Sequence, residues 1–185
     1  MNSKDKTNKK RFQRITLFVM TITSVILIFN VTTAYAARFR SYGWPSATVP
    51  VKTYSYNSTW QTPMNQSVLN WNGTPTRIGF SKSSSSSNNI YASQYSWSDY
   101  GKCTSTYTGS KITNYTIKLN SRTISADATN LSNFIQSVFV HELGHTIWLG
   151  DNPNTSSSSI MKYSRNRNSM TKPSSYDISS VNTKY

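Results

Sequence analysis

Cysteine is almost absent from this sequence: Cys103 is the only one among 185 residues. A single cysteine cannot form an intrachain disulfide, so the fold depends on its hydrophobic core and on any metal it binds. A cysteine nucleophile would need a histidine as its base. The sequence has only two histidines, and both belong to another motif, so a cysteine hydrolase is disfavoured.

Acidic residues are also few: six Asp and Glu stand against 20 Lys and Arg, for a formal net charge of +14. Six of the basic residues and one of the acidic residues lie in residues 1–36, so the remainder carries a net charge of about +9. This excess favours anionic surroundings such as cell-wall polymers, membrane surfaces or acidic proteins, although it also serves solubility alone. No cluster of Lys and Arg is interleaved with aromatic residues, so no nucleic-acid partner is expected.

Only one stretch of the sequence is long and apolar, and it lies near the N-terminus. Residues 1–14 are basic, an apolar run follows, and the small residues AYA at 34–36 come next. This order predicts a signal peptide over residues 1–36 that is cleaved after Ala36, so the protein is expected to be secreted, extracellular or associated with the cell wall. The alternative is an uncleaved anchor helix, since about 20 apolar residues span a bilayer. Contact with a membrane is expected only through this segment.

The rest of the chain, residues 37–185, is long enough for one domain with one core. Helical spacing of apolar residues predicts a helix over 59–71 and a second helix that begins with Ser132 as its N-cap. Alternation of apolar and polar residues predicts strands, the last two of them paired as a hairpin or at a sheet edge: residues 49–56, 77–80, 89–94, 103–109 and 112–120.

Histidine and glutamate are the scarcest titratable residues, and all three copies lie in the stretch HELGHTIWLGD, residues 141–151. His141 and His145 are four residues apart, which places them on one face of a helix about 6 Å apart along its axis. Two such imidazoles can bind zinc at about 2.0–2.1 Å. Glu142 is rotated from them by about 100°, so it can act on a water beside the metal. The alternative is a pair of helix-surface histidines beside a solvated carboxylate.

A catalytic zinc usually has three protein ligands and one open position. The sequence has no third histidine and no second glutamate, so the remaining donor is an aspartate. Asp151 lies six residues after His145 and directly after Gly150, a residue at which the chain can turn back toward the metal. The alternative for Asp151 is a turn-forming residue within GDNPN.

The stretch HELGHTIWLGD resembles the extended zinc-binding motif of the metzincin metallopeptidases, H-E-x-x-H-x-x-G-x-x-H/D. The form that ends in Asp is similar to the snapalysin type, and the surrounding domain, over most of residues 42–185, resembles the matrixins. The resemblance implies an α/β (α+β) fold: a twisted, mostly parallel sheet with an antiparallel edge strand, an active-site helix and a C-terminal helix. The motif's glycine is Trp148 here, and Gly150 is the residue expected to make the turn instead.

The stretch SIMKY, residues 159–163, resembles the Met-turn of the same family. The resemblance implies that Met161 forms an apolar floor beneath the metal and that Tyr163 donates to the reacting carbonyl. Ordinary core packing for Met161, and surface or core packing for Tyr163, are the alternatives. The resemblance also implies that Asp177, in the closing helix, is a buried partner of the Met-turn backbone.

Taken together, the resemblance implies a secreted zinc metalloendopeptidase, a hydrolase of peptide bonds. His141, His145 and Asp151 would hold one zinc ion, and Glu142 would be the general base for a zinc-activated water. Tyr163 would stabilise the oxyanion.

A protein or peptide is the expected substrate, anionic cell-wall polymers are a further expected partner, and the chain is expected to be a monomer. No structural calcium is expected, because the serine-rich loop before residue 89 has no acidic side chain. Two alternatives stay open: a cell-surface or cell-wall-binding protein with a structural or decayed zinc site, and a zinc peptidase that acts on peptidoglycan cross-links. Residues 164–176 show no residue diagnostic of cleavage specificity.

Overall fold

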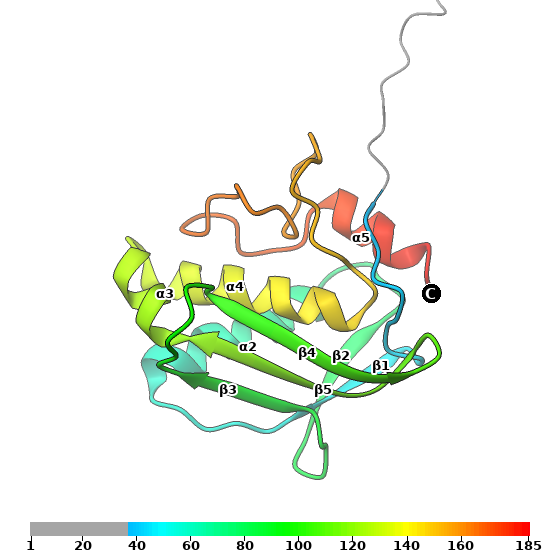
Figure 1. Ribbon diagram of the computed structural model, residues 1–185, viewed down its shortest axis with the longest axis horizontal. Coiled ribbons are helices and arrows are strands. Elements are labelled where there is room, and N and C mark those ends of the chain that lie inside the picture. Colours follow the sequence, from blue (N-terminus) through cyan, green and yellow to red (C-terminus); the bar gives the residue numbers. More distant parts are fainter. Residues whose placement is uncertain (1–36) are drawn as a thin grey trace, which may run out of the picture. The chain divides into compact units, whose positions relative to one another are not determined.

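The computed structural model describes residues 37–185, and the predicted signal peptide over residues 1–36 lies outside the described residues. Among these residues, no helix is both long enough and apolar enough to cross a bilayer. The elements follow one another as shown in Figure 1: β1 (Thr48–Lys52), α2 (Ser58–Asn72), β2 (Gly79–Ser83), β3 (Asn89–Ser93), β4 (Gly101–Thr108), β5 (Lys111–Asn120), α3 (Ser121–Asp127), α4 (Leu131–Thr146) and α5 (Ser175–Asn182).

The strands form two small sheets. In the first, β1 pairs in parallel with β2. In the second, the order is β3-β5-β4, with β3 parallel to β5 and β4 antiparallel to β5 at the sheet edge. The predicted α+β class is confirmed, but the expectation of one mostly parallel sheet is not met, because β1 and β2 separate from the other three strands.

Strand β1 is shorter than the strand predicted over residues 49–56. Its residues TVPVK alternate outward and inward, so Val49 and Val51 are fully buried. The predicted strand continued to residue 56, but β1 ends at Lys52, whose backbone N–H donates to the Asn88 carbonyl at 3.0 Å. Tyr54 then packs edge-on against Phe139 of α4, so the chain after β1 serves the core without further strand pairing.

Two helix predictions need correction. The N-cap of α4 is Asn130, whose side chain accepts from the Asn133 N–H at 3.0 Å, and not Ser132. Asn caps a helix as well as Ser does, so the pattern did not separate the two positions. The short helix α3 was not predicted, because only Thr123 and Ile124 are buried in its seven residues and no apolar periodicity develops.

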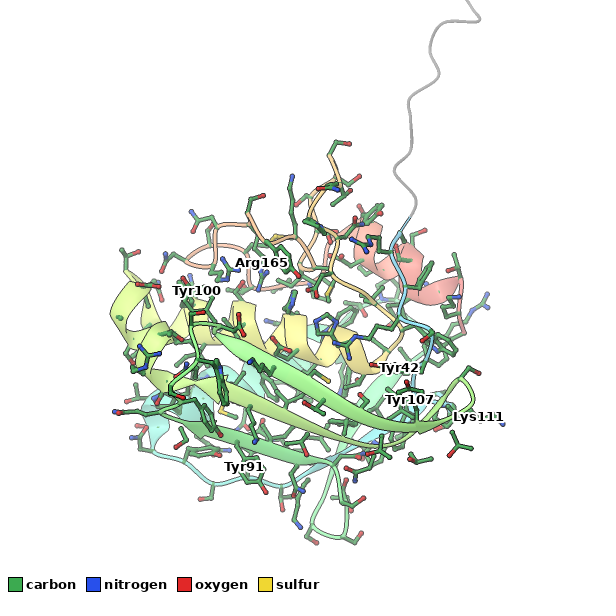
Figure 2. The ribbon with its side chains drawn as sticks, in the orientation of Figure 1. Tyr42, Tyr91, Tyr100, Tyr107, Lys111 and Arg165 are labelled. Carbon is green, nitrogen blue, oxygen red and sulfur yellow. The ribbon has the colours of Figure 1, made fainter. Side chains whose placement is uncertain are left out.

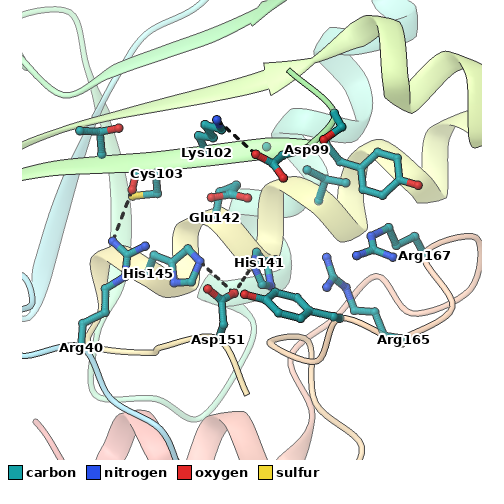
Figure 3. A pocket seen from close by; sticks show the side chains of 16 residues that line it. Arg40, Asp99, Lys102, Cys103, His141, Glu142, His145, Asp151, Arg165 and Arg167 are labelled. Atoms are coloured by element: carbon teal, nitrogen blue, oxygen red, sulfur yellow. Dashed lines mark hydrogen bonds and ion pairs between the residues drawn. The ribbon is translucent and has the colours of Figure 1, made fainter. Parts of the chain in front are cut away.

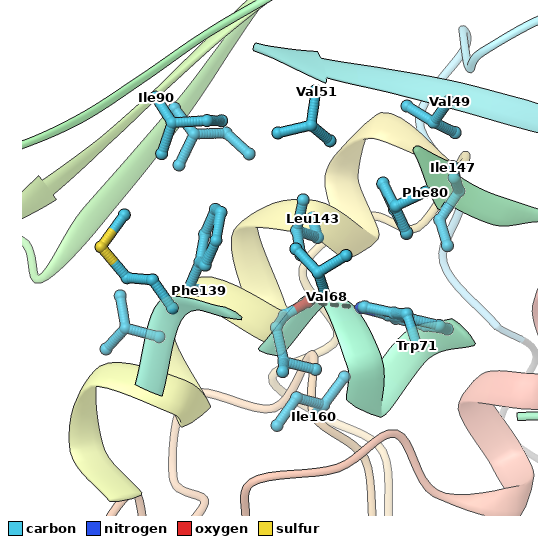
Figure 4. Packing of buried hydrophobic residues seen from close by; sticks show 14 of the residues in the cluster. Val49, Val51, Val68, Trp71, Phe80, Ile90, Phe139, Leu143, Ile147 and Ile160 are labelled. Carbon is cyan, nitrogen blue, oxygen red and sulfur yellow. Dashed lines mark hydrogen bonds between the residues drawn. The ribbon is translucent and has the colours of Figure 1, made fainter. Parts of the chain in front are cut away.

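The hydrophobic core lies where α2 and α4 pack together and against the strands (Figure 4). The Trp71 indole N–H donates to the Val140 carbonyl at 2.9 Å, which fixes α2 against the middle of α4. Around this contact, the fully or nearly fully buried side chains include Val49, Val51, Val68, Phe139, Leu143, Ile147 and Ile160. Because α4 is buried on nearly all sides over its second half, any polar side chain it carries there faces either the core or the cleft.

Candidate metal centre

Helix α4 carries three titratable side chains that are all buried: His141, Glu142 and His145. The Nδ1 atom of His141 lies 3.0 Å from the Ile160 carbonyl, and the Nδ1 atom of His145 lies 2.8 Å from the Leu149 carbonyl. A carbonyl can only accept, so each Nδ1 atom carries the proton and each Nε2 atom presents a lone pair. Such a contact fixes both the tautomer and the orientation of a metal-binding histidine.

Asp151 completes a group of three ligands with these histidines. Its Oδ1 atom lies 3.2 Å from His141 Nε2 and 3.5 Å from His145 Nε2, and one ligand atom from each residue lies within 4.8 Å of the others (Figure 3). Lone pairs of two neutral imidazoles and a carboxylate therefore converge on one point. They repel one another unless a cation lies between them, and the donor set N, N, O suits zinc. The group could hold a metal ion, and its chemistry fits that role.

Burial favours the neutral imidazole in this group. It lowers the pKa of His141 to about 3, with the nearby Arg165 cation acting in the same direction and Asp151 opposing it. Burial raises the pKa of the Asp151 carboxyl, but the two neighbouring histidines, when protonated, lower it by more, so the net shift of the pKa is downward. Both groups are therefore in their metal-binding protonation states at neutral pH.

The turn that brings Asp151 back to the histidines is made at Trp148. Its φ of 76° lies in the left-handed region, where the family motif has glycine. The expectation that Gly150 would make this turn is wrong, because no positive φ occurs there. The backbone N–H of Gly150 instead donates to the Arg38 carbonyl at 2.8 Å, and a Cβ at Gly150 would lie 3.2 Å from that oxygen.

A segment near the N-terminus supports this turn from outside; we call residues 38–44 the N-terminal strap. Arg40 N–H donates to the Trp148 carbonyl at 2.7 Å, and Phe39 forms a bridge with Leu149. Further along the strap, the ring of Tyr42 stacks on that of Tyr107 in β4, with centroids 4.1 Å apart (Figure 2). The strap thus connects the Asp151 turn to the edge strand.

The Met-turn region lies on the other side of the histidines. The Met161 sulfur would lie 2.8 Å from a Cβ added at Gly144, so this methionine packs closely against the face of α4 that lies between the two histidines. Asp177 of α5 is buried and accepts from Ser159 Oγ at 2.5 Å and from the Ile160 N–H at 2.8 Å. The implied contact of Asp177 with this backbone is present, and it holds the Ile160 carbonyl where His141 needs it.

Glu142 has an environment unlike that of any other carboxylate in the described part of the chain. It is 5% exposed, and no hydrogen-bond donor among residues 37–185 contacts its carboxylate. Desolvation raises its pKa above the ordinary value. The side chain lines a cleft of about 510 Å³ together with the three ligand residues and β4 (Figure 3). A Cβ at Gly101, the first residue of β4, would lie 2.6 Å from Glu142 Oε1, so only glycine leaves room there.

Tyr163 lies at the rim of the same cleft and is 53% exposed. Partial burial and the nearby Asp151 carboxylate raise its pKa, so the phenol keeps its proton at neutral pH. Its role as a donor to a reacting carbonyl stays a prediction.

Sequence reasoning missed three arginines that line the cleft: Arg40, Arg165 and Arg167. Arg165 and Arg167 belong to residues 164–176, the segment in which the sequence showed no residue diagnostic of cleavage specificity. Arg165 and Arg167 lie in a loop without periodicity, so no local pattern in the sequence predicted that they line the cleft.

Comparisons with known proteins give little support for a family. No family model matches the chain, and no curated protein matches it. Among solved structures, a chain of the "GM1 bound form of the ECX AB5 holotoxin" is similar, with a TM-score of 0.48 and 12% sequence identity, over 81% of this chain and 86% of that chain.

These comparisons correct the family prediction. The structural match is to a chain of a toxin assembly, and nothing in the comparisons supports membership of the metzincin family. The function taken from that resemblance, a secreted zinc endopeptidase with its cell-wall-binding and peptidoglycan alternatives, is corrected with it. Because the similarity to the toxin chain is so distant, it assigns no activity either, and the site is interpreted from its own geometry.

Proposed function

We propose that this chain is a zinc-dependent hydrolase that uses Glu142 to activate water against a carbonyl bond. The observation that carries the proposal is the Glu142 carboxylate, which is buried, lacks a hydrogen-bond donor and faces the cleft that holds the three ligand residues. The Glu142 oxygens reach the cleft, and a purely structural metal site gives no reason to place a carboxylate without a protein donor beside the ligand residues.

In this proposal His141, His145 and Asp151 hold the metal and leave its cleft side open. When bound, Zn²⁺ supplies a Lewis acid for the carbonyl oxygen and lowers the pKa of water toward about 7. Glu142 accepts the proton of the attacking water and then delivers it to the leaving group. In the metal-free protein, burial raises the pKa of Glu142, and a raised pKa helps a carboxylate to take the proton of water. Tyr163 donates from the rim to the oxyanion that develops.

The bond attacked is an ester or an amide, since both place a polarised carbonyl between water and a leaving group. An amide makes use of both steps, because the amine that leaves from an amide requires the proton that Glu142 holds. Export, a monomeric state and the absence of a nucleic-acid partner stay predictions from the sequence.

The test combines metal analysis with hydrolysis assays. Purified protein should bind one zinc ion per chain and hydrolyse members of an ester and peptide panel, and a chelator should abolish the activity. Glu142→Ala should keep the zinc and lose about 10²–10⁴-fold in turnover, whereas Gln66→Ala, which changes an exposed side chain outside the cleft, should keep both. Zinc-loaded protein that cleaves nothing in the panel, or a Glu142→Ala variant with the parental rate, would refute the proposal.

A further inference from the structure

Two arginines lie at one end of the cleft, beyond His141 as seen from His145 (Figure 3). Both come from the loop between the Met-turn and α5, and they are only two residues apart in the sequence. No carboxylate of the described chain forms an ion pair with either of them: the pairs within 4.0 Å among residues 37–185 join Asp99 to Lys102 and Asp151 to the two histidines. Two guanidinium groups thus lie beside a metal centre without a counter-anion.

Arg165 is 9% exposed and is held in a fixed position by α4. Its Nε–H donates to Ser137 Oγ at 3.0 Å, and one terminal nitrogen donates to the Ser137 carbonyl at 3.3 Å. The other terminal nitrogen donates to the Lys162 carbonyl at 2.9 Å. A guanidinium has five N–H donors, so two remain after these three bonds. The positive charge itself is not neutralised by any of these neutral acceptors.

Arg167 is held differently. Its guanidinium lies over the ring of Tyr100, with the central carbon 4.7 Å from the ring centroid. Tyr100 is itself fixed, because its hydroxyl donates to Asp127 at 2.7 Å and its ring packs edge-on against Phe134. The Arg167 Nε atom is buried and has no hydrogen-bond partner in the described residues. Its planar group is thus oriented by stacking while its donors stay unpaired.

The position of the two cations relative to each other is unfavourable in the free protein. Burial lowers the pKa of both, and the charge of Arg167 is the next contribution to the lowering for Arg165. An anion placed between them relieves this repulsion and accepts the unpaired donors. A planar carboxylate fits a guanidinium through two parallel hydrogen bonds, which makes it the natural complement.

We infer that Arg165 and Arg167 form an anion subsite of the metal centre, which binds a carboxylate of the substrate close to the bond that is cleaved. The inference rests on the proposed function, since it assigns a substrate class to the same site. The subsite selects substrates with an acidic group near the reacting carbonyl over neutral and basic ones. Arg167, with its free donors, makes the direct contact, and Arg165 adds charge from a rigid position.

The experiment measures binding to zinc-loaded protein by calorimetry. The probes are hydroxamates, which chelate the metal, with a side group that ends in a carboxylate or in the matched carboxamide, at three chain lengths. At one length or more, the carboxylate should bind about 10- to 100-fold more tightly than the carboxamide, the range expected for hydrogen bonds to a charged group. Higher salt should reduce this preference.

Variants locate the preference on the protein. Arg167→Leu should remove it and leave carboxamide binding unchanged, and Arg167→Lys should keep part of it, because the charge stays and the planar fork is lost. Arg77→Leu is the matched control, since Arg77 is an exposed arginine outside the cleft. Arg165 is not the primary target, because its bonds to α4 tie it to the fold; thermal unfolding of each variant verifies that the structure is intact.

The outcomes separate the two proposals. Equal binding of carboxylate and carboxamide at every length, or a preference that persists in Arg167→Leu, overturns the anion subsite and leaves the metal site standing. Failure of all hydroxamates to bind zinc-loaded protein overturns the proposed hydrolase instead.

Discussion

Two buried carboxylates in this protein have opposite surroundings. Asp177 of α5 accepts hydrogen bonds from Ser159 Oγ and from the backbone N–H groups of Ile160 and Ser174. Glu142 of α4 is nearly as buried and accepts none within the described chain. The first environment is what stability requires of a buried charge, and the second is what stability alone would remove. Under the proposed function, the difference separates a carboxylate that holds the fold together from one that acts in the reaction.

The largest expected effect comes from breaking the structural member of this pair. Asp177→Ala leaves three donors without their acceptor, so we expect a loss of about 3–5 kcal/mol in the free energy of unfolding. Zinc affinity should fall as well, because the Ile160 carbonyl that orients His141 loses its anchor. Denaturant unfolding and zinc titration measure the two effects. Asp127→Ala, which removes one exposed contact, should cost less than about 1 kcal/mol; similar losses in both variants would contradict the structural role of Asp177.

An intermediate effect is expected when Glu142 is crowded. In Gly101→Ala the new methyl group would meet Glu142 Oε1 at 2.6 Å and Val138 Cγ1 at 2.9 Å, so the carboxylate must move. We expect a loss of about 1–3 kcal/mol in stability, the usual cost of overpacking, together with reduced hydrolysis at unchanged zinc content. Gly79→Ala is a matched control at the first residue of β2, where the nearest atom would lie at an ordinary 3.4 Å. Full activity in Gly101→Ala would show that the position of Glu142 does not matter.

The smallest expected effect is a gain in stability, on replacing Glu142 by Gln in the metal-free protein. The folded-state pKa of Glu142 is raised by burial, so at pH values above its unfolded-state pKa the folded state must hold an unfavourable charge or keep a proton that the unfolded chain releases. The stability of the metal-free protein therefore falls as the pH rises from the unfolded toward the folded pKa. Glu142→Gln should remove this term and stabilise the metal-free protein by about 0.5–2 kcal/mol, the common range for such changes.

Thermal unfolding between about pH 4 and 8 tests this, and the gain from Glu142→Gln should be greatest at the high end of that range. Added zinc should shrink the gain, because the cation favours the carboxylate. If Glu142→Gln instead destabilises the metal-free protein to the extent of Asp177→Ala, the two carboxylates do not differ in the way proposed.

Local patterns predicted the helical half of the site, and they failed where distant segments meet. The spacing of His141 and His145 was sufficient to place both imidazoles on one face, because helix geometry depends only on neighbours. Strand β1 ends earlier than predicted, and α4 begins at a different N-cap. Both differences come from tertiary contacts and capping, which periodicity does not encode. Arg165 and Arg167 reach the cleft through a loop whose path depends on Asp177 and Ser137, so no window of sequence around them reveals their position.

The resemblance to a known motif had a similar limit. It anticipated the convergence of Asp151 with the histidines, yet it predicted the wrong residue for the turn. Tryptophan rarely adopts a left-handed backbone, and such a conformation costs about 1–2 kcal/mol. Here two contacts hold Trp148 in this conformation: the hydrogen bond from the strap to its carbonyl, and the packing of its indole against Gly43. The packing is close, because a Cβ at Gly43 would lie 2.3 Å from the Trp148 ring. A local sequence motif does not predict tertiary contacts of this kind.

The N-terminal strap has a practical consequence for making the protein. The backbone of Arg38 and Arg40 completes the turn that carries Asp151, so a processing cut or a fusion joint placed inside residues 38–44 alters the ligand geometry itself. An affinity tag therefore belongs upstream of this segment with a cleavable spacer. If the site holds zinc as proposed, preparations that begin at different residues across the strap should differ in metal content even though every ligand side chain is present.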